Sequence, residues 1–345
     1  TNNKIHERFF CCGKYNFKFE DSIMDRSDEG KTQSWDFLPK NNKLNEFIDC
    51  FEENTKVGNL IDSGIVYEAD NQSIFNANDN NPNPDSCREL KKRFGTFDLS
   101  MMNYNAAGPY PSCFNNLNEE EKVAEHSKNL QRNVDYLYEN LKILNSKYFL
   151  PFAGAYVLGG KLAYKNKYLG TMSWDKCIEM LNNKEKIRGT EYIALNEGTT
   201  FDLDSGEPDC QYQLIDENEI EFYVESTLSK LKYPYELEEM PDKLKLVEDI
   251  NKAVSAMNER LDRIKLIPDM CVFLEVGEKE IPIIKVSDSL SKGNLKCTMD
   301  LRLLRRILDR SSHWNNAEIG CHIAFTRKPN YYSPDMHTAL QFFHL

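Results

Sequence analysis

The sequence contains no uninterrupted apolar run of about 18 residues, so it offers no candidate for a membrane-spanning helix. Its start, TNNKIHERFF, has neither an initiator methionine nor the apolar centre of a signal peptide. We therefore predict a processed chain or the later part of a longer polypeptide. Positive charge is also in deficit, because 43 Lys and Arg stand against 55 Asp and Glu, for a net charge of −12. A field of that sign repels nucleic acids and anionic membranes, so we expect neither as a partner.

The cysteine and histidine spacings of known metal and redox motifs are missing as well. The ten cysteines are scattered, without a Cys-x-x-Cys pair or a zinc-finger spacing, and the adjacent Cys11 and Cys12 are poorly placed for a mutual disulfide. None of the six histidines forms a His-x-His or His-x-x-x-His pair. We predict reduced thiols that mostly serve as small buried apolar residues, and hence a cytoplasmic protein.

Local catalytic signatures are lacking too. The chain has no Gly-x-Ser-x-Gly turn, no Gly-x-Gly-x-x-Gly loop and no phosphate-binding loop with its Lys-Ser/Thr ending. What it does have is enough apolar sequence, 40%, for a buried core, and enough length for one large domain or two ordinary ones. Residues 183–218 are polar and irregular, so we place a boundary there, between regions 1–190 and 191–345.

The first region has an α/β rhythm. Two short strands at 65–67 and 73–75 flank a turn at 70–71, and a further strand is predicted at 97–102. Asn118 and three glutamates then begin an amphipathic helix, and its apolar stripe runs from Val123 through Leu130, Val134, Leu137 and Leu141 to Leu144. A buried strand at 148–150 follows. Strand, helix and strand in this order predict the α/β class.

The second region has the pattern of a small α+β domain. Apolar residues at spacings of three and four predict a helix over 243–265, and a hairpin is predicted from 271–276 and 281–286. The remaining elements are expected as a strand at 296–300, helices at 301–309 and 334–343, and a strand at 318–326. Arg302, Arg305, Arg306 and Arg310 form a basic helix face, for which pairing with acidic side chains is the simplest account.

Four stretches could carry chemistry, and each also has a purely structural interpretation. Asp79, in the amide-rich loop after the second strand, is a metal-ligand candidate, although a turn residue bonding backbone amides is the commoner case. In MMNYNAAGPYPSCF (101–114), small residues allow close backbone approach, and Tyr104 and Tyr110 could stack on a sugar or base. The same stretch could equally be a rigid connection.

The other two stretches are LPFAGAYVLGG (150–160) and SSHWNNAEIGCHIAFTRKP (311–329). The first ends a strand at the carboxyl edge of an α/β sheet, where ligands usually bind. In the second, Trp314 and Asn315 could line a site, or could cap the preceding helix. The residues alone do not choose between these interpretations.

In sequence order, these stretches resemble one family. GIVYEADNQSIFNANDN, NYNAAGPYPSCF, YFLPFAGAYV, MDLRLLRRILDRSSHWNNAEIG and FTRKPNYYSPDMH are similar to the metallo-β-lactamase-fold portion of the CMP-N-acetylneuraminate hydroxylases and the related UDP-N-acetylmuramate hydroxylases. The similarity covers about 57–345. It implies an αββα sandwich, of which 1–190 would hold the second half, followed by a smaller α+β C-terminal domain at 191–345.

The resemblance also implies a site. It places Asp79 at the metal, and it implies substrate contacts from side chains that would face the site, namely Asn103, Tyr104, Tyr110, Tyr156, Trp314 and Asn315. The substrate implied is a polar small molecule such as a nucleotide-linked amino sugar, whose N-acetyl group becomes N-glycolyl. The cofactor would be a transition metal, zinc or iron, if upstream ligands exist, and otherwise none. An electron-transfer partner or an upstream domain would complete the system.

The sequence departs from the family in two places. It lacks the His-x-His-x-Asp-His motif of the fold's first half, and it lacks the Rieske cysteine and histidine ligands. Two alternatives therefore stand beside the hydroxylase: a metal-dependent hydrolase of the same fold, and a non-catalytic binding module with a degenerate metal site.

Overall fold

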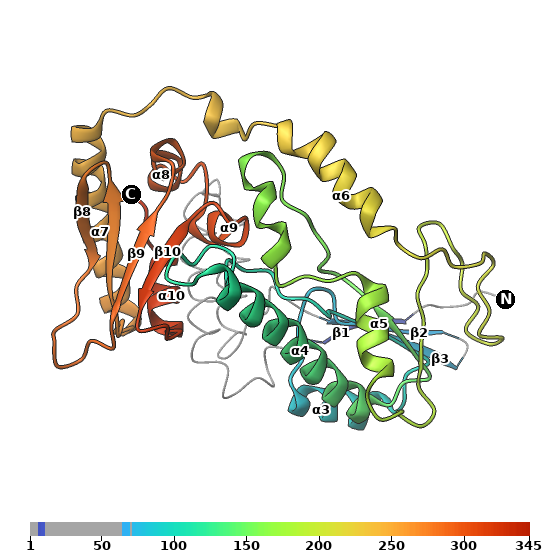
Figure 1. The fold of residues 1–345 in the computed structure, drawn as a ribbon. Helices are drawn as coiled ribbons and strands as arrows, with labels where there is room; N and C mark the ends of the chain where they lie inside the picture. Colours follow the sequence, from blue (N-terminus) through green and yellow to red (C-terminus); the bar gives the residue numbers. More distant parts are fainter. Residues whose placement is uncertain (1–5, 11–63, 70) are drawn as a thin grey trace, which may run out of the picture.

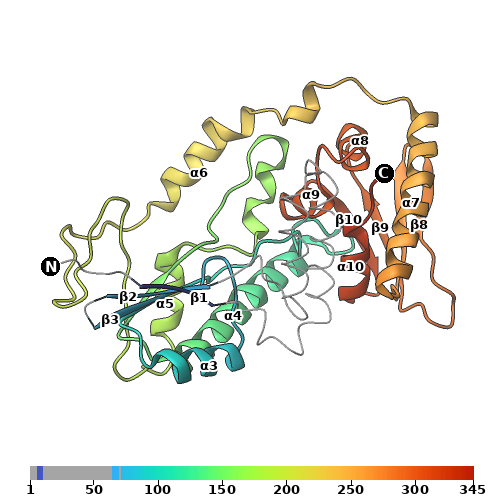
Figure 2. The same cartoon turned by 180° about the vertical axis from the view of Figure 1, so that it is seen from behind.

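Two β-sheets organise the protein. The computed structural model describes residues 6–10, 64–69 and 71–345, and these residues form a mixed α/β structure (Figure 1). Sheet A has the strand order β1-β2-β3-β4-β5-β6, and sheet B has the order β10-β9-β7-β8. The two sheets lie at opposite ends of the molecule in both views (Figures 1 and 2). The predicted α/β class is confirmed, whereas the αββα sandwich stays a prediction.

Sheet A begins antiparallel and continues parallel. Its strands are β1 (His6–Phe10), β2 (Gly64–Ala69), β3 (Gln72–Asn76), β4 (Leu99–Met102), β5 (Tyr148–Pro151) and β6 (Glu191–Tyr192). The pairs β1–β2 and β2–β3 are antiparallel, and β3 to β6 run parallel. The predicted hairpin at 65–75 is therefore confirmed. Because β3, β4 and β5 are parallel, the loops that follow them leave from the same edge of the sheet.

Helices cover one face of sheet A. They are α3 (Pro84–Phe94), α4 (Glu119–Leu144) and α5 (Trp174–Asn182), of which only α4 was predicted. In α4, Asn118 and Glu121 form the full capping box, which explains where the helix starts. The predicted stripe is buried from Val134 onward, but Val123 is 53% exposed, so its inclusion was wrong. None of the apolar clusters of the described residues includes Val123.

Side chains of sheet A alternate between two apolar layers. Phe75 and Phe149 point into the core beneath α3 and α4, where Leu141 meets them. Their neighbours Ile74 and Tyr148 point to the opposite face, and there Phe201 packs edge-on against Tyr148 at 4.9 Å between ring centroids. This second layer is thinner than the first, because an irregular segment covers it instead of helices.

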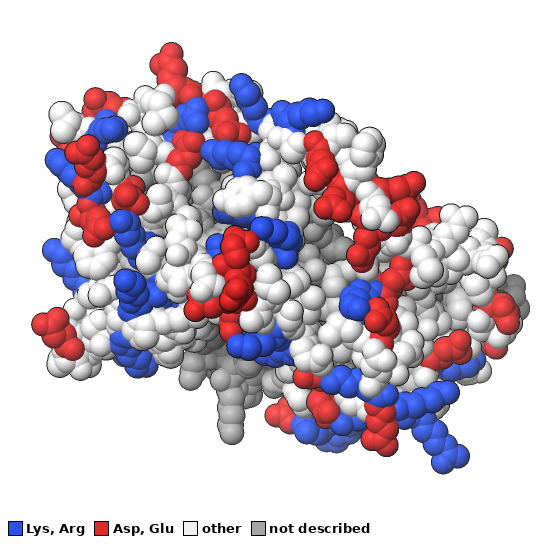
Figure 3. All heavy atoms as spheres, viewed as in Figure 1, with Lys and Arg blue, Asp and Glu red and all other residues white. Residues whose placement is uncertain are grey.

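The segment between the sheets is irregular and carries α6 (Glu217–Ser226) and the 3₁₀ turns η3 (Leu228–Lys230) and η4 (Pro234–Leu237). In Figures 1 and 2 it passes along the top of the molecule from one end to the other. Acidic side chains gather over α6 (Figure 3), and Val224 is the residue that this helix buries. Among the described residues, no helix combines the length and the apolar character needed to cross a membrane.

Sheet B and its helices are formed by residues 243–345. Its strands are β7 (Cys271–Val276), β8 (Lys279–Ile284), β9 (Asn294–Thr298) and β10 (Ala324–Lys328), and its helices are α7 (Lys243–Ile264), α8 (Leu301–Leu308), α9 (Trp314–Ile319) and α10 (Pro334–Gln341). The predicted helices and hairpin are confirmed. The predicted strand over 318–326 was wrong in its first half, because the His313 side chain accepts the amide of Asn315 and starts α9 instead.

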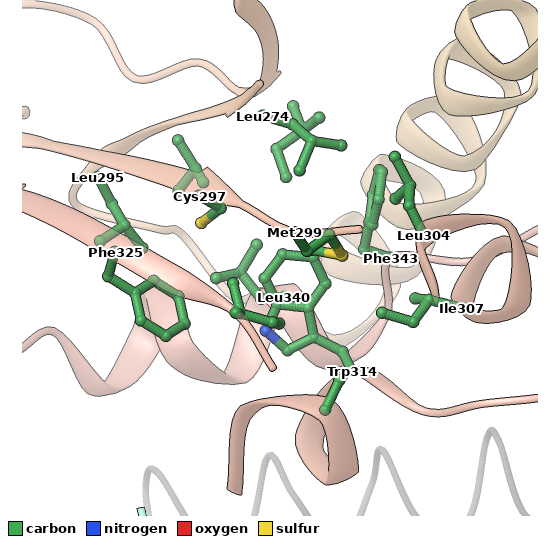
Figure 4. Packing of buried hydrophobic residues seen from close by; sticks show 14 of the residues in the cluster. Leu274, Leu295, Cys297, Met299, Leu304, Ile307, Trp314, Phe325, Leu340 and Phe343 are labelled. Atoms are coloured by element: carbon green, nitrogen blue, oxygen red, sulfur yellow. The ribbon is translucent and has the colours of Figure 1, made fainter. Parts of the chain in front are cut away.

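The core of sheet B is the larger of the two main apolar clusters and takes in residues from far upstream. Figure 4 shows part of it, with Trp314 among Met299, Leu340 and Phe343. Cys113, Phe114, Leu158, Leu162 and Leu169 belong to the same cluster. Phe114 forms a parallel bridge with Phe325 and stacks on its ring at 5.2 Å. The segment after β4 therefore joins the two ends of the molecule, and the boundary at 190 stays a prediction.

Candidate functional site

Three loops meet at the carboxyl edge of β3, β4 and β5. The Asn103 amide, directly after β4, donates to the backbone oxygen of Asp79 at 3.2 Å, which ties the loop after β3 to the loop after β4. The Asn105 amide donates to the backbone oxygen of Gly154 at 3.1 Å and so ties in the loop after β5. This edge is the candidate site, and hydrogen bonds from amide side chains set its shape.

Asp79 lies at the tip of its loop with its side chain exposed. Asn78 before it has a positive φ of 57°, and the Asn76 side chain accepts the Asn78 amide at 2.8 Å. These features form the tight turn that a polar loop after a strand requires. The backbone of Asp79 is thus held while its carboxylate faces outward, free to contact a ligand at the edge.

Asn105 organises the edge and was missed in the sequence analysis. It is 2% exposed, and its amide nitrogen bonds the backbone oxygens of both Gly154 and Met172, at 3.1 and 2.9 Å. Its side-chain oxygen accepts the Met172 amide at 2.9 Å. The sequence did indicate that Tyr104 and Asn105 point to different sides of the chain, because adjacent residues of an extended segment alternate. That alternation does not reveal which backbone groups an amide will meet.

Gly154 is the position where the edge admits no side chain. Its φ is +107°, and a Cβ built there would lie 2.9 Å from the Asn103 side-chain oxygen and 3.1 Å from the Cβ of Asn105. Gly154 and Ala155 are exposed, as are Ala106 and Ala107 across the edge. Small residues therefore line both sides of the edge.

Tyr104 lies beneath this edge. Its side chain is 3% exposed and belongs to the core under the helices of sheet A. Burial raises the pKa of its hydroxyl above the ordinary value, and the nearby Cys177 adds to the shift. A neutral, enclosed phenol supports the loop from below, which differs from the stacking surface that the sequence suggested.

Tyr110 and Tyr156 lie where the segment after β4 meets the sheet B core. The Tyr110 hydroxyl donates to Glu125 on α4 at 2.9 Å and accepts from Asn330 at 3.0 Å. Tyr156 is half-buried, and burial raises the pKa of its hydroxyl to about 12, with further contributions from the nearby Cys321 and Cys113. Both rings are thus engaged in contacts between the two ends of the molecule.

Trp314 and Asn315 begin α9, in the sheet B part of the protein. Trp314 is 1% exposed and packs edge-on against Phe343 at 5.8 Å (Figure 4). Asn315 is partly exposed in the first turn of the helix. Of the seven site residues expected from the sequence, Asp79 and Asn103 are joined by a hydrogen bond, while the metal or substrate roles of all seven stay predictions.

The edge does not by itself make a metal site. The described residues contain no group of three or more His, Cys, Asp or Glu side chains placed to hold a metal ion. A zinc or iron centre needs three or more nitrogen, oxygen or sulfur ligands, and Asp79 would supply one. The residues in hand therefore do not fit the implied metal, and we derive no chemical step through it.

A separate hollow of about 580 Å³ lies at the opposite, amino edge of β5 and β6. Its lining includes Lys147, Lys184 and Lys186. Lys184 pairs with Asp135, and Lys147 donates to the backbone oxygen of Leu203 at 3.0 Å. The hollow lies at the far edge from Asp79, so it is not part of the candidate site.

No family model matches the chain, and no curated protein matches its sequence.

Proposed function

We propose that the protein binds a nucleotide-linked amino sugar, or a similar polar small molecule, at the carboxyl edge of sheet A. The observation that carries this proposal is the convergence of three loops after parallel strands, held by Asn103 and Asn105 and topped by the exposed Asp79 carboxylate. The exposed Asp79 carboxylate supplies an acceptor for sugar hydroxyl and amide N–H groups, and the small residues beside it leave room for a ligand.

We further propose that the chain is the later part of a metallo-β-lactamase-type protein related to the amino-sugar hydroxylases. Two observations support this. The loop that carries Asp79 follows a strand, as the resemblance implies. The face of sheet A opposite its helices, which the irregular segment with Phe201 covers only in part, is apolar but half-buried at Ile74, Met101 and Leu150. A second sheet packed on that face would complete a sandwich. In that arrangement Asp79 would be one ligand of a metal whose other ligands lie outside the described residues.

Binding without turnover is the second candidate. It is favoured by the make-up of the edge, because, apart from Asp79, the exposed or partly exposed Asn103, Ala106 and Gly154 carry no side chain that reacts with a ligand. A metal-dependent hydrolase of the same fold would use the same edge. Metal content separates the enzymes from the binding module.

The test is calorimetric titration of the protein with UDP-N-acetylmuramate and with CMP-N-acetylneuraminate, alongside elemental analysis. We expect Asp79→Asn to weaken binding of the preferred sugar nucleotide about tenfold, since a hydrogen bond to a charged group contributes about 1.5–3 kcal/mol. The matched control is Asp288→Asn, which neutralises another exposed loop carboxylate beyond β8 and should bind as the wild type does.

The outcomes divide the candidates. Stoichiometric zinc or iron that Asp79→Asn loses supports a metal enzyme, and binding of either sugar nucleotide without metal supports the binding module. If neither sugar nucleotide binds, or if both aspartate variants bind equally well, the proposed edge site is wrong.

A further inference from the structure

Two cysteines from distant parts of the chain meet where the segment after β4 crosses to sheet B. Cys113 is 1% exposed and Cys321 is 0% exposed. The Cys113 sulfur lies 3.5 Å from the backbone oxygen of Cys321, and the Ser112 hydroxyl lies 3.7 Å from one sulfur and 3.6 Å from the other. Because 208 positions separate the two cysteines, tertiary packing alone brings them together.

A buried lysine completes the cluster. Lys165, on the 3₁₀ helix η2 (Gly160–Tyr168), is 6% exposed, and its ammonium lies 3.2 Å from the Cys113 sulfur and 2.6 Å from the Cys321 backbone oxygen. Within the described residues it forms no ion pair with a carboxylate. A buried ammonium needs a compensating negative charge, and the nearest group able to supply one is the Cys113 sulfur as a thiolate.

The electrostatics agree with this geometry. The interaction with the Cys321 thiol is the main cause that lowers the pKa of Cys113, and the charge of Lys165 lowers it further. The pKa of Cys321 is raised in return, so one thiolate and one thiol share the cluster. Cys177 behaves differently, because burial without such partners raises its pKa to about 12.

We propose that Cys113 and Cys321 are an oxidisable pair that closes into a disulfide when the protein meets a hydroperoxide. The Cys113 thiolate attacks one oxygen of hydrogen peroxide, so that an S–O bond forms and the O–O bond breaks. The departing hydroxide takes a proton from Lys165 and becomes water. Cys113 is then a sulfenic acid.

The second step consumes the remaining thiol. Cys321 gives its proton to Lys165, and its sulfur displaces hydroxide from Cys113, which forms the S–S bond. The hydroxide takes a proton from Lys165 and leaves as a second water. In total the thiolate, the thiol, the ammonium and one peroxide yield a disulfide, a neutral amine and two waters, so that the two sulfurs are oxidised and the peroxide oxygens are reduced.

The bond would join the two ends of the molecule. Cys113 leads into the bridge between Phe114 and Phe325, and Cys321 lies in the turn that leads from α9 to β10. Oxidation would therefore lock the loop after β4, which shapes the edge at Asn103 and Asn105, onto sheet B. A thiol reductant would release it.

The experiment is oxidation of the purified full chain with hydrogen peroxide, alkylation of the remaining thiols under denaturing conditions, and peptide mass mapping. We expect a cross-linked peptide pair containing Cys113 and Cys321 that disappears after reduction, and a rise in the melting temperature of the oxidised protein. Peptide mapping keeps this pair distinct from Cys11, Cys12 and Cys50.

Variants assign the roles. Cys321→Ser should stop at a sulfenic acid on Cys113 that dimedone traps, and Cys113→Ser should form no link. Lys165→Met should slow the reaction about tenfold by raising the pKa of the attacking thiol, while Lys165→Arg should retain most of the rate. Cys177→Ser, at an equally buried cysteine without a cation beside it, is the matched control and should react as the wild type does.

Three results would overturn the proposal. The first is that Cys113 and Cys321 remain alkylatable after the exposed Cys210 has been oxidised. The second is a product that links Lys165 to Cys113 through an added oxygen, in place of the disulfide. The third is a link that forms at the same rate in Lys165→Met.

Discussion

The two ends of the molecule use polar side chains for different purposes. At sheet A, parallel strands deliver three loops to one edge, and the buried Asn105 ties their backbones together while Asp79 remains exposed. At sheet B, a hairpin and four helices enclose an apolar core. The parallel strands thus leave an edge lined by exposed loops, where we propose binding, whereas the elements of sheet B enclose an apolar core.

The charged residues around sheet B illustrate the difference. Arg302 pairs with Asp300 at 2.7 Å, Arg305 with Asp249 at 2.7 Å, and Arg306 with Glu238 at 2.6 Å. The predicted ion pairing of the basic face is confirmed for these three arginines. Because these three arginines form ion pairs within the protein, this helix face attracts an anionic ligand less strongly than the number of arginines suggests.

The largest effect should come from a charge placed beneath sheet A. Leu137→Asp puts an unpaired carboxylate at a position that is 3% exposed under the sheet, and we expect a loss of about 5 kcal/mol in unfolding free energy. Val123→Asp, on the same helix but 53% exposed, should change the unfolding free energy by less than about 0.5 kcal/mol. Chemical denaturation followed by circular dichroism measures both, and equal effects would contradict the described packing of α4.

A substitution of Trp314 tests whether this side chain packs the sheet B core or contacts a substrate. Trp314→Ala should lower the unfolding free energy by about 4 kcal/mol through the cavity that it leaves. Tyr164→Ala, at an aromatic side chain that is 68% exposed, should have little effect. A Trp314→Ala protein that melts normally but no longer binds sugar nucleotides would give Trp314 the substrate-contact role that the sequence suggested.

Asn105 tests the architecture of the open edge. Asn105→Ala removes three hydrogen bonds at a buried position, and we expect a loss of about 3 kcal/mol in unfolding free energy. Asn103→Ala removes bonds at a partly exposed position and should lose only about 1 kcal/mol. Melting temperatures rank the two variants. The reverse ranking would show that Asn103, and not Asn105, contributes more to holding the three loops together.

Asp300 gives the smallest effect, and it depends on pH. The Arg302 guanidinium beside it lowers the pKa of the Asp300 carboxyl from 3.8 to about 2. Its stabilising contribution is therefore complete above the unfolded pKa and is lost as the pH falls from about 4 to about 2. Asp300→Asn, which retains an acceptor for the Arg302 amide, should lower the unfolding free energy at neutral pH by about 2 kcal/mol. If acid denaturation curves of the variant and the wild type stay parallel below pH 4, the ion pair contributes nothing.

Much of the local structure was predictable because it depends on nearest neighbours in the chain. Periodic apolar residues and caps located α4 and α7, and the strand pattern located the hairpin of β7 and β8. The helices α3 and α5 were missed, although Asn83 and Ser173 cap them, because short helices give weak periodicity. The start of β10 was misplaced because a helical turn at Trp314 competed successfully with the strand.

The candidate site was predictable only in part. Asp79 and Asn103 could be placed after strands from the local pattern, because the position of a strand end fixes where the following loop begins. Asn105 and Gly154 could not be joined in this way, because the strands β4 and β5 that bring them together are separated by the whole of α4. The burial of Tyr104 could not be read from the sequence for a related reason, because a tyrosine in a loop sequence carries no mark of the core beneath it.

By itself the sequence determined the elements and the sign of the charge, because helix periodicity, capping and net charge are properties of neighbouring or summed residues. Tertiary structure decided which polar groups meet. The contact of Lys165 with Cys113 and Cys321, and the closure of the edge by Asn105, each join segments tens or hundreds of residues apart. Such contacts exist only after the sheets have formed, and their chemistry depends on a burial that no local pattern records.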